Sequence, residues 1–200
     1  MCGIAGKLNF DFQSPVSPAL IKEMTREIHY RGPDDEGVWV SGNIALGQRR
    51  LSIIDLSRAG HQPMCNEDGT VWITYNGEIY NFPDLRKDLI TKGHRFRSHT
   101  DTEVIIHLYE EYGTGCLSFM RGMFAFGLWD DNKKLLFLAR DRIGQKPLKY
   151  YLDDHSLIFA SELKSILKDP RVKREVDLEA VDSFLTYQYV PHSLTGFKGI

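Results

Sequence analysis

Residues 123–140, MFAFGLWDDNKKLLFLAR, decide the fold class. Two apolar runs, 123–129 and 134–140, lie on either side of a segment that contains the turn-forming tripeptide Asp-Asp-Asn. This pattern predicts two strands that fold back on each other, because Asp and Asn tolerate the backbone conformations of tight turns. A third apolar run, 156–160, follows an Asp-Asp-His turn, so this half of the chain is expected to form antiparallel strands.

The N-terminal half supplies more strands and the helices that must cover them. Leu20, Ile21, Met24 and Ile28 recur at helical spacing, and Pro18 suits the first turn of that helix. Two antiparallel sheets faced by helices would bury the apolar face of every element, so the sequence predicts the α+β class. The other expected strands are 3–10, 36–40, 44–48 and 71–75, and the expected helices are 18–29, 83–92, 102–112, 161–168 and 178–187.

Length and charge limit the kinds of partner. The 200 residues carry a net charge of −2 with no block of like charge, which gives no reason to expect binding to nucleic acid or an anionic membrane. No apolar run approaches the length of a membrane span, and the N-terminus lacks the regions of a signal peptide. Cys2, Cys65 and Cys116 lack the spacing of a zinc site and suit a reducing compartment. We therefore expect a cytoplasmic protein with no metal ligands.

Cys2 has two interpretations. It follows the initiator Met1, and a small residue at this position allows the methionine to be removed. Removal would give one residue both a thiol and a free α-amine, whose pKa of about 7.7–8.0 lets it act as the base for its own side chain. On this interpretation Cys2 is an N-terminal nucleophile. On the other, it is a small apolar residue at the start of a strand.

Three other polar positions also have a structural and a functional interpretation. Arg50 is either the polar end of a strand or a bidentate partner for a carboxylate. Asn76-Gly77 is either a hairpin turn or a pair of donors for an oxyanion. Asp101 is either a first-turn carboxylate of the helix 102–112, for which Thr102 is the expected cap, or a partner for a substrate ammonium group.

The order of the sequence motifs resembles one enzyme family. Most of the chain is similar to the N-terminal glutaminase domain of glutamine-dependent asparagine synthetases, which are class II glutamine amidotransferases. The matching stretches are MCGIAG at 1–6, HYRGPDDEG at 29–37, RRLSIIDL at 49–56, YNGEIYNFPDLR at 75–86, HTDTEVI at 99–105, RGMFAFGLWD at 121–130, RDRIGQKPLKYY at 140–151 and SELKSIL at 161–167.

This resemblance implies a fold and a set of roles. The fold is a four-layer αββα sandwich of two antiparallel sheets, the N-terminal nucleophile hydrolase fold. Cys2 would attack the side-chain amide of glutamine, and Asn76 with Gly77 would stabilise the tetrahedral oxyanion. Arg50 would hold the α-carboxylate and Asp101 the α-ammonium group. Further glutamine contacts implied by matching position are the backbone of Leu51 and Ile53 and the side chain of Glu78.

The resemblance also implies that this chain carries half of a reaction. Residues 1–176 would form the amidotransferase domain, and 177–200 would lead into a C-terminal synthetase domain that binds ATP and Mg²⁺. The sequence contains no pyrophosphatase loop or P-loop, so no cofactor is expected in residues 1–200. The full protein would be a glutamine-hydrolysing asparagine synthase (EC 6.3.5.4) that passes ammonia to ATP-activated aspartate. A homodimer of the full protein is compatible with this resemblance.

Other functions stay open from the sequence. The same family amidates other carboxylates, including uronic acids of surface polysaccharides, so the ammonia acceptor is not fixed by these residues. A non-catalytic glutamine-sensing module would keep the fold, but it predicts a degraded site, whereas Cys2, Arg50 and Asp101 are all present. An N-terminal nucleophile amidase or protease needs an autoprocessed propeptide, whereas only Met1 precedes Cys2.

Overall fold

The stretch 123–140 forms the predicted hairpin. The computed structural model describes residues 1–191 and 193–200. In it, β6 (Gly122–Asp130) pairs antiparallel with β7 (Leu135–Arg140), and on its other side with β5 (Val71–Ile79). The short strand β4 (Met64–Cys65) completes a four-stranded sheet of order β4-β5-β6-β7. Asn76 and Gly77 lie within β5, opposite Ala125 and Phe124, so the hairpin-turn interpretation of Asn-Gly is wrong. Pairing with β6 along all of β5 overrides the local turn preference.

The second sheet has five strands and contains the N-terminus. Its order is β2-β3-β1-β9-β8, and all of its neighbours pair antiparallel. The central strand β1 follows directly after Cys2, so the fold fixes the backbone beside that thiol. The sequence analysis did not predict β4 or β8. The bounds are Gly3–Asn9 for β1, Asp35–Ser41 for β2, Ile44–Arg50 for β3, Lys149–Leu152 for β8 and Ser156–Ala160 for β9.

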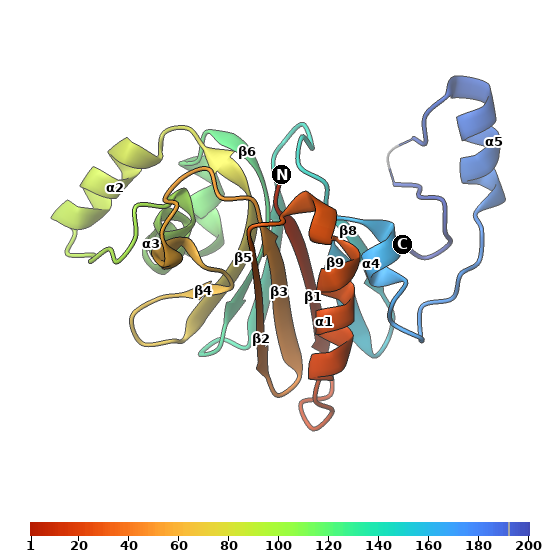
Figure 1. The fold of residues 1–200 in the computed structure, drawn as a ribbon, viewed down its shortest axis with the longest axis horizontal. Coiled ribbons are helices and arrows are strands. Elements are labelled where there is room, and N and C mark those ends of the chain that lie inside the picture. Colours follow the sequence, from red (N-terminus) through yellow and green to blue (C-terminus); the bar gives the residue numbers. More distant parts are fainter. Residues whose placement is uncertain (192) are drawn as a thin grey trace.

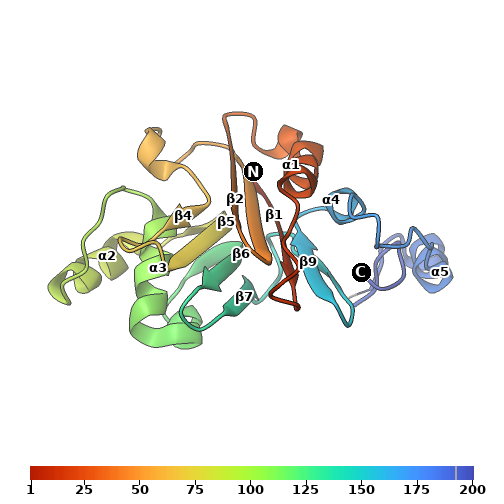
Figure 2. The ribbon, with the colours of Figure 1, turned by 90° about the horizontal axis from the view of Figure 1, so that it is seen from below.

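The two sheets stack face to face between two layers of helices. Figures 1 and 2 show α1 (Pro18–Glu27) and α4 (Leu163–Ile166) over the five-stranded sheet, and α2 (Phe82–Thr91) and α3 (Asp101–Tyr112) over the four-stranded sheet. Three apolar clusters fill the three spaces between these layers. The predicted α+β class and four-layer αββα sandwich are therefore confirmed. Short 3₁₀ helices span His29–Arg31, Arg58–Gly60 and Gly113–Ser118.

The helix α3 brings its first residue to the site. It begins one residue earlier than predicted, at Asp101, and its N-cap is Thr100, whose Oγ1 accepts a hydrogen bond from the Glu103 N–H. The prediction that Thr102 is the cap is wrong. The Thr102 hydroxyl instead accepts a hydrogen bond from the Gln62 side chain.

The helix α5 (Leu178–Tyr187) differs from the other helices because it is set apart from the sandwich (Figure 1). Its Asp177 N-cap satisfies the Glu179 and Ala180 N–H groups. Leu178, Phe184 and Leu185 are exposed, although large apolar side chains are usually buried in a completed core. In residues 1–191 and 193–200, none of the helices has the length and apolar character needed to cross a membrane.

Candidate active site

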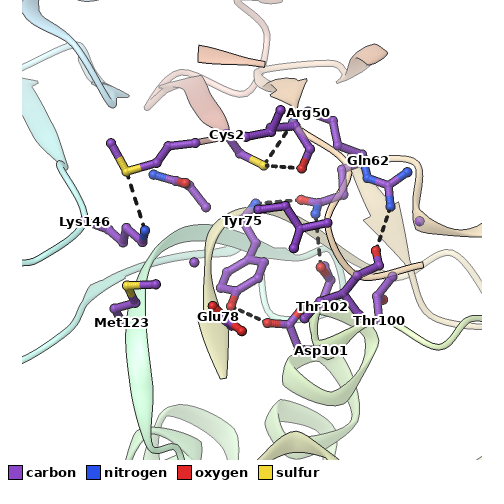
Figure 3. Close-up of a pocket in the computed structure, with 17 residues that line it drawn as sticks. Cys2, Arg50, Gln62, Tyr75, Glu78, Thr100, Asp101, Thr102, Met123 and Lys146 are labelled. Atoms are coloured by element: carbon purple, nitrogen blue, oxygen red, sulfur yellow. Dashed lines mark hydrogen bonds between the residues drawn. The ribbon is translucent and has the colours of Figure 1, made fainter. Parts of the chain in front are cut away.

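A pocket beside the N-terminus collects every residue to which the sequence analysis assigned a role (Figure 3). The residues come from both sheets, from α3 and from the segment 51–60 that follows β3. The pocket therefore forms where the stacked sheets bring these residues together. The assigned residues that line it are Cys2, Arg50, Leu51, Ile53, Asn76, Gly77, Glu78 and Asp101.

The Cys2 thiol is held by backbone groups. Its Sγ accepts a hydrogen bond from the Leu51 N–H at 3.4 Å and donates to the Leu51 carbonyl at 3.6 Å. The Arg31 Nε donates to the Cys2 carbonyl at 3.0 Å and so fixes the backbone on the other side. Burial raises the pKa of the Cys2 thiol, and the Leu51 N–H and the Arg50 charge only partly offset this increase. The thiol is therefore protonated at neutral pH and needs a base before it can act as a nucleophile.

Arg50 enters the pocket as a buried cation. Its NH1 donates to the Ser57 carbonyl at 3.2 Å, and its NH2 donates to the carbonyls of Ile54 and Asp55 at 3.2 and 2.5 Å. Within the described ranges, no carboxylate lies within 4.0 Å of it. Gly60 makes room for the guanidinium, because a Cβ there would lie 2.0 Å from NH2. The charge is thus positioned by the backbone but not neutralised.

Asn76 offers a free donor to the pocket. It is 2% exposed, and its Nδ2 has no hydrogen-bond partner among the described residues. A buried amide nitrogen without a partner costs about 1–3 kcal/mol, so its position calls for a functional explanation. Its neighbour Gly77 must be glycine, because a Cβ would lie 2.4 Å from the Met123 carbonyl oxygen. The close approach of β5 to β6 thus requires the glycine even without a ligand.

Asp101 enters the pocket from the first turn of α3. It is 4% exposed, and its Oδ2 accepts hydrogen bonds from the Tyr75 hydroxyl at 2.6 Å and from the Ile79 N–H at 2.9 Å. Burial raises the pKa of Asp101, although both hydrogen bonds act to lower it. Burial and the neighbouring Asp101 carboxylate raise the pKa of Tyr75, so its hydroxyl stays protonated as a donor. No cation lies within 4.0 Å of this carboxylate in the part of the chain that is described.

Among the described residues, the Arg50 cation and the Asp101 anion of this pocket therefore have no oppositely charged partner within 4.0 Å. Arg50 comes from the end of β3, and Asp101, with Glu78 nearby, lies across the pocket (Figure 3). The Cys2 thiol and the Asn76 amide line the same space. This arrangement suits a small zwitterion, whose carboxylate and ammonium groups would each replace water around a buried charge.

The sequence analysis missed several residues that build the pocket. The Gln62 side chain joins β5 to α3, because its Oε1 accepts from the Tyr75 N–H at 2.8 Å and its Nε2 donates to Thr102 at 3.0 Å. Lys146 is 7% exposed, and its Nζ donates to the Met1 sulfur at 3.6 Å. Asp141 shapes the turn before that lysine by accepting a hydrogen bond from the Lys146 N–H. The other lining residues without a predicted role are Ile54, Gly60, Thr100 and Met123.

Known proteins resemble this chain in sequence and in fold. A family model described as a glutamine amidotransferase domain matches residues 1–200. The chain is 44% identical over 179 residues to asparagine synthetase (glutamine-hydrolyzing) 3 of Bacillus subtilis strain 168, which covers 88% of this chain and 29% of that protein. It is 39% identical over 201 residues to asparagine synthetase (glutamine-hydrolyzing) 1 of Arabidopsis thaliana, which covers 99% of this chain and 32% of that protein. The chain thus spans about a third of the length of these relatives.

A solved structure supports the fold assignment. Glutamine phosphoribosylpyrophosphate amidotransferase of B. subtilis, complexed with ADP and GMP, superposes with a TM-score of 0.69 at 20% identity. The match covers 82% of this chain and 43% of that chain. At this level of identity, the likeness shows a shared fold.

Proposed function

Because this chain belongs to the family of glutamine amidotransferase domains, we propose that it hydrolyses glutamine to glutamate and ammonia through Cys2. The observation that carries the proposal is the buried Asn76 Nδ2, which lines the pocket of the Cys2 thiol and has no hydrogen-bond partner among the described residues. An unused donor beside a nucleophile is the arrangement that stabilises an oxyanion.

Glutamine binding uses the two uncompensated charges. The α-carboxylate of glutamine lies against the Arg50 guanidinium, and its α-ammonium group lies against Asp101 and Glu78. The backbone of Leu51 and Ile53 lines the same end of the pocket. These contacts direct the side-chain amide of the substrate toward the Cys2 sulfur.

The chemistry follows from the state of the thiol. Removal of Met1 gives Cys2 a free α-amine, and this amine takes the proton from the buried, protonated thiol. The thiolate forms a C–S bond to the amide carbon, and the Asn76 Nδ2 and the Gly77 N–H donate to the oxygen that becomes negative. Collapse of this intermediate breaks the C–N bond, and the leaving nitrogen takes the proton from the α-ammonium group. Water then hydrolyses the γ-glutamyl thioester.

The ammonia acceptor is proposed from the relatives. Both asparagine synthetases named above are longer than this chain, which supports aspartate, activated by ATP with Mg²⁺ on a C-terminal domain, as the acceptor. The exposed apolar residues of α5 provide a surface on which such a domain would pack. On this proposal, residues 1–176 are the glutaminase domain and 177–200 lead into the synthetase domain. The three free thiols suit a reducing compartment, so we place the protein in the cytoplasm.

Mass spectrometry tests the nucleophile. The intact mass is measured before and after treatment with 6-diazo-5-oxo-norleucine, a diazo-ketone that mimics glutamine. We expect loss of the Met1 mass and one adduct on Cys2; Cys65→Ala keeps the adduct, and Cys2→Ala abolishes both the adduct and glutamate release. A processed chain that takes up no adduct would contradict the proposal, and so would an adduct that persists in Cys2→Ala.

A second variant tests the observation that carries the proposal. Asn76→Ala removes the unpartnered donor, so glutamate release should slow by about 100- to 1,000-fold while the KM for glutamine changes little. Unchanged turnover in the folded variant would remove Asn76 from the oxyanion site.

A further inference from the structure

Outside the pocket, two histidines and a glutamate meet beside the middle of α3. His107 and Glu110 lie on α3, and His94 lies on the segment that connects α2 to α3. The two imidazole rings are 4.7 Å apart between centroids. Among the described residues, this is the group of three potential ligands whose donor atoms all lie within 4.8 Å of one another.

The outer nitrogen of each imidazole is already used as a donor. The His107 Nε2 lies 3.1 Å from the Arg95 carbonyl, which can only accept a hydrogen bond. The His94 Nε2 lies 3.0 Å from a Glu111 carboxylate oxygen. Both contacts place the imidazole hydrogen on Nε2 and leave the Nδ1 lone pair directed inward.

The inner nitrogens converge on one carboxylate oxygen. The Glu110 Oε2 lies 2.7 Å from the His107 Nδ1 and 3.4 Å from the His94 Nδ1. The other oxygen, Oε1, accepts a hydrogen bond from the Asn66 side chain at 2.8 Å, which fixes the carboxylate plane. Three lone pairs directed at one point repel each other unless a cation, either a proton or a metal ion, lies among them.

We propose that His94, His107 and Glu110 bind a divalent transition metal ion, with Zn²⁺ the best match. Imidazole nitrogen and carboxylate oxygen are ordinary zinc ligands, and metal-bound histidines typically donate their second N–H to a carbonyl or carboxylate. Here Arg95, Glu111 and Asn66 already supply these outer contacts, one to each ligand.

The ligand atoms, which all lie within 4.8 Å of one another, must adjust to reach the spacing of a zinc site. A tetrahedral zinc ion with bonds of about 2.0–2.1 Å places its ligand atoms roughly 3.3 Å apart. The His107–Glu110 contact would lengthen from 2.7 Å, and the His94–Glu110 contact at 3.4 Å already fits. His94 lies on a connecting segment, whose backbone can move more easily than that of α3. Water would complete the coordination, because Glu110 is at the surface.

No metal ligands were expected from the sequence, because the three cysteines lack the spacing of a zinc site. His94 and His107 are thirteen residues apart in the sequence. The fold brings them together by laying the α2–α3 connection along α3. A bound ion would tie this connection to the helix whose first residue is Asp101. The proposed site would therefore stabilise the segment that leads into the pocket, and it needs no part of the glutaminase chemistry.

Titration with metal tests the site. The Cys2→Ala, Cys65→Ala background is stripped with a chelator and titrated with Zn²⁺ by calorimetry, so that these two thiols do not take the ion. We expect one Zn²⁺ per chain, and a Co²⁺ absorption spectrum of nitrogen and oxygen ligation without a thiolate charge-transfer band. Absence of saturable Zn²⁺ binding, or a thiolate band, would overturn the proposal and leave protons as the cations of the cluster.

Variants separate the ligands from their surroundings. His94→Gln and Glu110→Gln should each weaken Zn²⁺ binding by at least about 100-fold, and Glu111→Ala, which removes an outer contact, by about 10- to 100-fold. His155→Gln, a change at an exposed histidine outside the cluster, should leave binding unchanged. Circular dichroism checks that each variant is folded, and Zn²⁺ should raise the Tm of the parent but not of Glu110→Gln. Equal affinity in the parent and both ligand variants would refute the site.

Discussion

Two buried cations in this protein have opposite surroundings. Lys7 in β1 is 5% exposed and forms an ion pair with Asp169, which is 1% exposed. Arg50 at the end of β3 is 7% exposed, yet within the described part of the chain its side chain donates only to backbone carbonyls of the segment 54–57. The two buried carboxylates differ in the same way. Asp169 pairs with the Lys7 cation, whereas Asp101 accepts hydrogen bonds from a tyrosine hydroxyl and a backbone N–H.

The difference separates charges that are paired within the fold from charges that, on the proposed function, bind the two charged groups of glutamine. A buried ion pair offsets the cost of removing both ions from water, so Lys7 and Asp169 need no ligand. Arg50 and Asp101 lack an ionic partner among the described residues, and on the proposed function glutamine supplies the opposite charge to each of them. Substitution of one residue from each set tests this difference.

The largest expected effect is on stability, from Lys7→Met. This change leaves Asp169 buried with only Arg171 near its carboxylate, at 3.4 Å, so the free energy of unfolding should fall by about 3–5 kcal/mol. Urea denaturation measures it. Lys7→Met with Asp169→Leu is the matched control and should recover most of the loss, since an apolar pair of similar volume fits the site. A single variant as stable as the parent would show that the pair is not needed.

The next effect is on binding, from Arg50→Met. Loss of the charge-assisted contact to a carboxylate should weaken glutamine binding by about 1.5–3 kcal/mol, or about 10- to 150-fold. The concentration dependence of diazo-ketone labelling at Cys2 gives this affinity. The free energy of unfolding should fall less than in Lys7→Met, because Ser57, one of the partners of Arg50, is exposed to water. Unchanged affinity would remove Arg50 from the carboxylate role.

A smaller effect is expected from Gly60→Ala. The added Cβ would lie 2.0 Å from the Arg50 NH2, so the guanidinium must move and its contacts to the backbone weaken. Each hydrogen bond of this kind contributes about 0.5–1.5 kcal/mol, so glutamine affinity should fall by less than in Arg50→Met. Gly115→Ala is the control, because open space surrounds that glycine. If both changes have the same effect on affinity, Gly60 has no special role in placing Arg50.

The smallest effect is a difference in how the contributions of Asp169 and Asp101 to stability depend on pH. Burial acts to raise the pKa of Asp169, but the hydrogen bonds from Lys7 and the Arg171 N–H and the charges of both residues together outweigh it, and the pKa is lowered. Asp169 therefore stabilises the fold above the ordinary carboxyl pKa, and this contribution is lost as the pH falls through its lowered value.

The contribution of Asp101 to stability should depend on pH with the opposite sign. Burial raises its pKa, so its ionised form destabilises the fold at neutral pH and the penalty disappears as the pH falls. Asp101→Asn should thus raise the free energy of unfolding at pH 7 while weakening glutamine binding. Denaturation of this variant and of Asp169→Asn between pH 3 and pH 7 measures both signs. A loss of stability at pH 7 in Asp101→Asn would contradict the account of Asp101 as a charge kept for a ligand.

The sequence predicted the elements whose signal is local. The helix with Ile21 and Met24 on one face and the hairpin at 123–140 formed as expected, because spacing and turn chemistry act over a few residues. Two predictions from local signals were wrong. Asn76-Gly77 pairs with β6 instead of forming a turn. The Thr102 hydroxyl accepts a hydrogen bond from Gln62, and Thr100 caps the helix.

The residues around the site were less predictable because their contacts are long-range. Gln62 reaches Tyr75 and Thr102, which are 13 and 40 residues away. No local sequence pattern around Gly60 predicts that it makes room for the Arg50 guanidinium. The resemblance to a family supplied the residues proposed to contact the substrate, whereas only the fold revealed those that hold them in place.

The position of Cys2 and Asn76 on different sheets has a consequence for folding. Cys2 precedes the central strand of the five-stranded sheet, and Asn76 lies in the four-stranded sheet. Neither sheet alone brings Cys2 and Asn76 together, so on the proposed function a partly folded chain with only one complete sheet should not react with a glutamine mimic. Trp39 in β2 and Trp72 in β5 stack across the same boundary at 4.6 Å, and their fluorescence should change when the sheets dock. During refolding, reactivity of the thiol toward a glutamine mimic should thus return with this signal and never before it.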